Sequence, residues 1–87
     1  MPDVKEEIPI GREMYYIIFK AYGYTVDKGV ITEFYPSINM YSIKNTHDEM
    51  EYIIKSNRIF RLKVDAVKRC NTLKRFERDG GHIPSLL

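Results

Sequence analysis

The sequence lacks most of the features that would assign it to a secreted or membrane class. Cys70 is the only cysteine in 87 residues, so an internal disulfide framework is excluded and a reducing compartment is expected. The longest uninterrupted apolar run, Met14 to Phe19, has six residues, far short of the ~20 that a membrane-spanning helix needs. The acidic start MPDVKEEIPI is unlike a signal peptide. We expect a protein of the bacterial or host-cell cytoplasm, with no membrane partner.

Motifs that specify a reaction or a cofactor are also missing. There is no glycine-rich phosphate loop, no serine-nucleophile motif and no pair of inward carboxylates. His47, Asp48 and Glu49 stand together, but with His82 they do not provide the spacing of a metal site. Cys70 falls on the expected buried face, where thiols are usually inert. We therefore expect a protein that is not an enzyme, with no catalytic residues, no metal and no cofactor.

The composition, 44% hydrophobic and 30% charged, is that of one small globular domain. We expect an N-terminal arm at 1–8, a single α+β domain at 9–79 and a C-terminal tail at 80–87.

The charges are divided unevenly along the chain. Residues 1–54 carry five Lys and Arg against nine Asp and Glu, whereas residues 55–87 carry nine against three. Such asymmetry points to an anionic partner for the second half. The other explanation is that the two halves neutralise each other, either in the fold or in a head-to-tail dimer.

The first half of the sequence predicts a helix followed by β structure. Residues 9–22 place Ile10, Met14, Ile17, Ile18 and Ala21 on one helical face, and Gly23 would end that helix in a left-handed conformation. A strand over the apolar run is the alternative.

Residues 24–44 have the composition of two or three antiparallel strands. A turn is expected at Asp27-Lys28-Gly29, with positive φ at Gly29, and a break at Pro36-Ser37.

The second half predicts one or two helices. Thr46 and Glu49 have the spacing of a capping box at the start of a helix over 45–56. A long helix over 58–78 follows, because Ile59, Leu62, Ala66, Cys70 and Leu73 share one face; Gly80-Gly81 would stop it. The alternative is a strand at 58–64 and then a helix capped by Asp65. The predicted fold class is α+β: an N-terminal helix, a small antiparallel sheet of two or three strands, and one or two C-terminal helices.

The basic C-terminal helix is the first candidate binding site. Phosphate binding needs Lys and Arg held along one face, and Asn71 and Thr72 could add hydrogen bonds. The competing interpretation is an ordinary solvated helix face, since no zinc-finger spacing, RNP-type motif or GxxG clamp is present. The candidate nucleic-acid-binding residues are Arg58, Arg61, Lys68, Arg69, Lys74, Arg75 and Arg78.

A surface rich in tyrosine is the second candidate site. Seven Tyr residues exceed what a small core can hold, and Tyr suits both base stacking and protein interfaces. The competing interpretation is that Tyr rings surround the core with their hydroxyls in water. The candidate partner-binding residues are Tyr15, Tyr22, Tyr35, Tyr41, Phe60, Val64 and Val67.

Together these patterns predict a small non-enzymatic protein that binds an anionic partner through its basic helix, with nucleic acid, RNA or DNA, as the first candidate. The alternative is a regulator or inhibitor, of the phage type among others, that docks on a larger protein through its Tyr-rich apolar surface. A homo-oligomer is the third hypothesis, because the strip of Phe60, Val64 and Val67 needs a sheet, a partner or a second copy to cover it.

Overall fold

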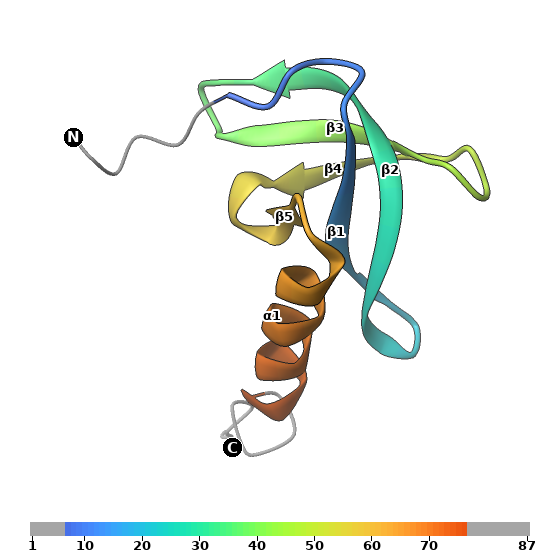
Figure 1. The fold of residues 1–87 in the computed structure, drawn as a ribbon, viewed down its shortest axis with the longest axis vertical. Coiled ribbons are helices and arrows are strands. Elements are labelled where there is room, and N and C mark those ends of the chain that lie inside the picture. The colour runs from blue at the N-terminus through green and yellow to red at the C-terminus, as the bar shows by residue number, and fades with distance from the viewer. Residues whose placement is uncertain (1–6, 77–87) are drawn as a thin grey trace.

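The computed structural model describes residues 7–76, which form a five-stranded antiparallel sheet followed by one helix (Figure 1). The strands lie side by side in the order β4-β3-β2-β1-β5. A short 3-10 helix, η1, connects β4 to β5. The elements are β1 (Glu13–Lys20), β2 (Gly23–Tyr35), β3 (Met40–Asn45), β4 (Glu51–Lys55), η1 (Ser56–Arg58), β5 (Ile59–Phe60) and α1 (Lys63–Phe76).

The long strand β2 makes the sheet curl into a half-barrel. Its first part pairs with β1 and its second part pairs with β3, and the register shifts between Ile31 and Glu33. Such an irregularity bends a strand and increases its twist. The concave side of the curl holds the main core, which consists of Met14, Tyr16, Ile31, Tyr41, Ile43, Ile54 and Ile59.

Helix α1 packs against β1, β2 and β5. Because side chains alternate along a strand, Ile17 lies on the face opposite Tyr16, and both side chains are buried. The helix buries Ala66 and Cys70, four residues apart and therefore on one face. We infer that α1 covers the convex face of β1, while the half-barrel core covers its concave face.

The predicted N-terminal helix is wrong, since this segment forms β1. Both faces of β1 are buried near its middle, so the apolar residues run continuously and imitate one helical face. The composition of the run, with adjacent Tyr and Ile pairs, is typical of a strand. Gly23 does not end a helix; it follows the turn of the β1–β2 hairpin with φ of +108°.

The prediction of β structure over 24–44 is confirmed for β2 and β3, but the sheet has five strands and not two or three. The turn expected at Asp27-Lys28-Gly29 is wrong, because these residues lie within β2. Gly29 does not have a positive φ. A Cβ at this position would meet the Ile43 side chain and would lie 2.7 Å from the Lys44 carbonyl oxygen. The close approach of β3 therefore explains why this position needs a residue without a side chain.

The helix predicted over 45–56 is also wrong: these residues form the β3–β4 hairpin. The buried side chain of Asn45 organises its loop. Asn45 Oδ1 accepts hydrogen bonds from the amides of His47 (2.7 Å) and Asp48 (3.0 Å), as in an Asx turn. Thr46 makes no cap, and Glu49 has φ of +63°, which is left-handed backbone rather than helix.

The single helix predicted over 58–78 is wrong as well. The alternative, a strand and then a helix, is closer, but the strand is only Ile59–Phe60 and the helix begins at Lys63, with Asp65 in its first turn. The class is still α+β, with the sheet first and one helix last. Gly80-Gly81, the tail at 80–87 and most of the arm at 1–8 lie outside the described residues.

Candidate nucleic-acid interface

The outer side of α1 is basic. With 3.6 residues per turn, Lys68 and Arg75 lie about 180° from the centre of the face that carries Ala66 and Cys70, and Asn71 lies between them along the helix. Arg69 and Lys74 lie on opposite flanks. All five polar side chains are exposed. The Thr72 hydroxyl, which the sequence offers as a hydrogen-bond donor to phosphate, instead donates to the Lys68 carbonyl oxygen at 3.1 Å.

Further cations lie just before the helix, at Arg58 and Arg61, and at its first residue, Lys63. Arg61 and Lys63 are exposed, and Arg58 is half-buried in η1. Residues 58–76 thus hold seven Lys and Arg against one acid, Asp65. The structure brings together Arg58, Arg61, Lys68, Arg69, Lys74 and Arg75 on or next to α1. The seventh predicted residue, Arg78, lies outside the described residues.

The ion pairs in the described part of the chain leave the basic helix out. Lys20 Nζ lies 2.8 Å from Asp27 Oδ2, and Lys28 Nζ lies 3.9 Å from Glu13 Oε2. The hydrogen bond to Asp27 raises the pKa of Lys20. Both pairs join β1 to β2. Within residues 7–76, therefore, no carboxylate forms an ion pair with a cation of α1.

Aromatic side chains gather near the tip of the β1–β2 hairpin. The rings of Phe19 and Tyr24 meet edge to face, with 4.9 Å between centroids. The guanidinium of Arg58 lies over the Tyr24 ring at 5.3 Å, within the usual range of a cation–π contact. Tyr22 occupies the turn and is 100% exposed. Exposed rings beside cations are the elements from which sites for unpaired bases are built.

A small polar cleft of about 300 Å³ lies where α1 begins. Lys28, His47 and Lys63 bring it basic groups, and Tyr15 and Asp27 also line it. The cleft joins the start of the helix to the β3–β4 loop. It extends the basic region beyond α1 itself, although Asp27 adds a carboxylate.

The predicted partner-binding residues do not form one surface. Tyr41 is 3% exposed and belongs to the core, and its hydroxyl accepts a hydrogen bond from the Ile8 amide at 3.0 Å. Tyr15 and Tyr35 are half-buried, as is Phe60, which pairs with Tyr15 in the sheet. Tyr22, Val64 and Val67 are exposed. The expected strip along one helix is absent because Phe60 lies in β5, whereas Val64 and Val67 lie in α1.

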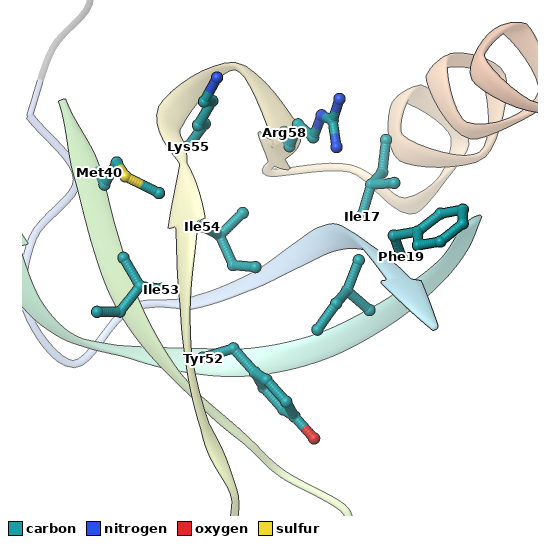
Figure 2. Close-up of a pocket in the computed structure, with 9 residues that line it drawn as sticks. Ile17, Phe19, Met40, Tyr52, Ile53, Ile54, Lys55 and Arg58 are labelled. Atoms are coloured by element: carbon teal, nitrogen blue, oxygen red, sulfur yellow. The ribbon is translucent and has the colours of Figure 1, made fainter. Parts of the chain in front are cut away.

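A second, more apolar cleft of about 320 Å³ runs beside β4 (Figure 2). Met40 and Ile53 lie on one side of the strand, and Tyr52 and Ile54 lie on the other. Phe19 contributes from β1, and Lys55 and Arg58 stand at one end. Burial and the hydrogen bond that Tyr52 donates to Asp48 (3.2 Å) both raise the pKa of Tyr52. The lining includes no carboxylate.

Neither a metal centre nor a membrane span is found in residues 7–76. These residues include no group of three His, Cys, Asp or Glu side chains arranged to hold a metal ion. Their helices are also too short and polar to cross a bilayer.

The comparisons with known family models, curated proteins and solved structures gave no match for this chain. Function must therefore be argued from the residues and their arrangement.

Sequence reasoning missed two parts of this candidate interface. Lys63 is not among the predicted binding residues, yet it lies in the first turn of α1 and lines the polar cleft. The Phe19–Tyr24 pair was hidden by the predicted helix over 9–22. The signal for it is a hairpin, because residues 19 and 24 flank the Ala21-Tyr22 turn, which Gly23 follows.

Proposed function

We propose that this protein is a small, non-enzymatic nucleic-acid-binding protein of the cytoplasm, and that α1 binds the phosphate backbone. The observation that carries the proposal is the set of exposed cations on and before α1, which have no ion-pair partner within residues 7–76. Cations already paired with carboxylates would have to lose those partners before they could bind phosphate.

The arrangement suits contacts to the backbone rather than to particular bases. Affinity for phosphates comes from charge neutralisation and counterion release, which need exposed Lys and Arg along one face but no geometry matched to particular bases. Lys68 and Arg75 lie about 10 Å apart along the helix axis, at 1.5 Å per residue. Asn71, between them, can donate a hydrogen bond to a phosphate or a base.

The aromatic side chains at the tip of the β1–β2 hairpin favour single-stranded nucleic acid over duplexes. Tyr22 is exposed and Phe19 is half exposed, so each can stack an unpaired base, a contact worth about 1–3 kcal/mol per base. The bases of a duplex are already stacked inside it, so a duplex would gain only the electrostatic part of the binding free energy. We expect a labelled single strand to bind more tightly than a duplex of the same sequence.

Fluorescence anisotropy at low salt tests the proposal. The chain should bind a labelled oligonucleotide, and Lys68→Ala/Arg75→Ala should weaken binding by about tenfold or more, because two phosphate contacts are lost. Arg12→Ala/Lys44→Ala is the matched control, since it removes the same charge from exposed positions outside α1. Absence of binding to single strands and duplexes at low salt would overturn the proposal, as would equal losses in the two double variants.

A protein-binding regulator or inhibitor, including one of phage type, is the second candidate function. The observation that favours it is the apolar cleft beside β4, with Phe19 and Ile53 both more than half exposed. A pull-down with and without nuclease treatment separates the two candidates. A protein partner that remains after nuclease treatment favours the regulator.

A further inference from the structure

The free edge of β4 can pair with another strand. β4 is the terminal strand of the sheet and has β3 on one side only. Its open side borders the apolar cleft of Figure 2. Edge strands of this kind present unpaired backbone groups that readily accept a further strand.

The direction of those backbone groups follows from the ends of the β3–β4 ladder. The Asn45 amide donates to the Met50 carbonyl at 2.8 Å, and the Ser56 amide donates to the Asn39 carbonyl at 3.1 Å. Hydrogen-bonded pairs alternate with non-hydrogen-bonded pairs along an antiparallel ladder. In the observed register, the backbone groups of three residues therefore point away from β3 to the free edge: Glu51, Ile53 and Lys55.

The sequence of β4, EYIIK, is self-complementary in charge. If a second copy pairs with it antiparallel and centred on Ile53, Glu51 faces Lys55 of the second copy and Lys55 faces Glu51 of the second copy. Residues with outward backbone groups then lie opposite one another, as hydrogen bonding requires. The two Ile53 side chains meet on the same face. Ile53 is 54% exposed in the single chain, so this contact would remove apolar area from water.

The neighbouring strand supports the same register. Lys44 of β3 is the cross-strand neighbour of Glu51, so Glu51 would lie between Lys44 and Lys55 of the second copy. Opposite charges in neighbouring cross-strand positions are stabilising, whereas like charges are destabilising. Neither Glu51 nor Lys55 forms an ion pair within residues 7–76.

We propose that the protein forms a symmetric homodimer in which β4 pairs with β4 of a second copy, centred on Ile53 and flanked by Glu51–Lys55 contacts. The two sheets join into one continuous sheet across the twofold axis. This interface excludes α1, so the inference does not depend on nucleic-acid binding.

Sedimentation across micromolar to millimolar concentrations tests the dimer. The wild-type chain should approach twice its mass of 10.3 kDa with a reversible, concentration-dependent equilibrium. Glu51→Lys and Lys55→Glu should each raise the dimer dissociation constant by about tenfold, because each places like charges opposite one another twice. Circular dichroism checks that both variants are folded.

Charge-swap pairs give the sharper outcome. An equimolar mixture of the two single variants should recover dimerisation, because each glutamate then faces a lysine. The double variant Glu51→Lys/Lys55→Glu should recover it as a homodimer. If neither the mixture nor the double variant recovers dimerisation while the single variants remain weakened, the proposed register is overturned. A wild-type chain that stays monomeric throughout, or single variants that dimerise like wild type, would overturn the interface.

A backbone variant tests the hydrogen bonds separately. Ile53→Pro removes an amide that points away from β3, so the internal ladder keeps its bonds, and edge strands tolerate proline in such positions. We expect dimerisation to be lost, whereas Ile53→Val, the matched control, should keep it. A folded Ile53→Pro chain that dimerises like wild type would contradict the proposal.

Discussion

At the scale of single residues, Asn45 shows how one buried side chain selects a loop over a helix. Its Nδ2 donates to the Tyr16 hydroxyl at 2.8 Å, and its Oδ1 accepts two amides of the β3–β4 loop. Burial raises the pKa of Tyr16, although the Asn45 hydrogen bond acts in the opposite direction. The side chain therefore links the loop to the core of the half-barrel.

Asn45→Ala should lower the free energy of unfolding by about 2–3 kcal/mol, because it leaves the buried Tyr16 hydroxyl and two loop amides without their partner. Thr46→Ala should cost no more than about 0.5 kcal/mol, as an exposed substitution. Thr46 donates only one hydrogen bond, to the Lys28 carbonyl at 3.3 Å. Urea unfolding of both variants provides the measurement. A larger loss for Thr46→Ala than for Asn45→Ala would restore the capping-box interpretation.

At the scale of elements, the strands that were not predicted from the sequence are those whose burial and hydrogen bonds depend on residues far away in the chain. Ile17 is buried from one side and Tyr16 from the other, so β1 shows no alternation that would distinguish it from a helix. The loop of the β3–β4 hairpin is held by Asn45, whose side chain donates a hydrogen bond to the Tyr16 hydroxyl, 29 residues away in the sequence. No local pattern contains that contact.

The elements that the sequence did predict have local signals. The strands in 24–44 are rich in β-branched and aromatic residues, and Pro36-Ser37 lies in the turn between β2 and β3. The shared face of Ala66, Cys70 and Leu73 marks α1 correctly, and so does the basic side opposite it. The same helical period continues back through Ile59, but there the chain forms β5 and pairs with β1.

The packing of α1 on the sheet can be tested at a fully buried residue of the helix. Ala66 is 0% exposed, so Ala66→Leu should force the helix away from its neighbours and destabilise the protein by about 1–3 kcal/mol. Val64→Leu adds bulk at an exposed position of the same helix and should change stability by less than about 0.5 kcal/mol. Thermal unfolding of both variants gives the comparison. Equal effects would mean that α1 presents a different face to the sheet.

At the scale of the whole molecule, the two halves of the sequence that differ in charge form different parts of the fold. Both ion pairs found in residues 7–76 lie between β1 and β2, in the acidic half. Neutralisation between the halves by direct ion pairs is thus not seen in the described part of the chain. The positive charge remains on and around α1, where it can attract an anionic partner.

The salt dependence of nucleic-acid binding tests this account most directly. The logarithm of the association constant should fall linearly with the logarithm of the salt concentration, with a slope of about 0.7–0.9 per phosphate contacted. Lys68→Ala/Arg75→Ala should reduce the slope by about 1.4 to 1.8, because two phosphate contacts are lost, whereas Arg12→Ala/Lys44→Ala should leave it unchanged. A slope that is the same in wild type and in the α1 double variant would show that this helix does not contact the backbone, and would contradict the account.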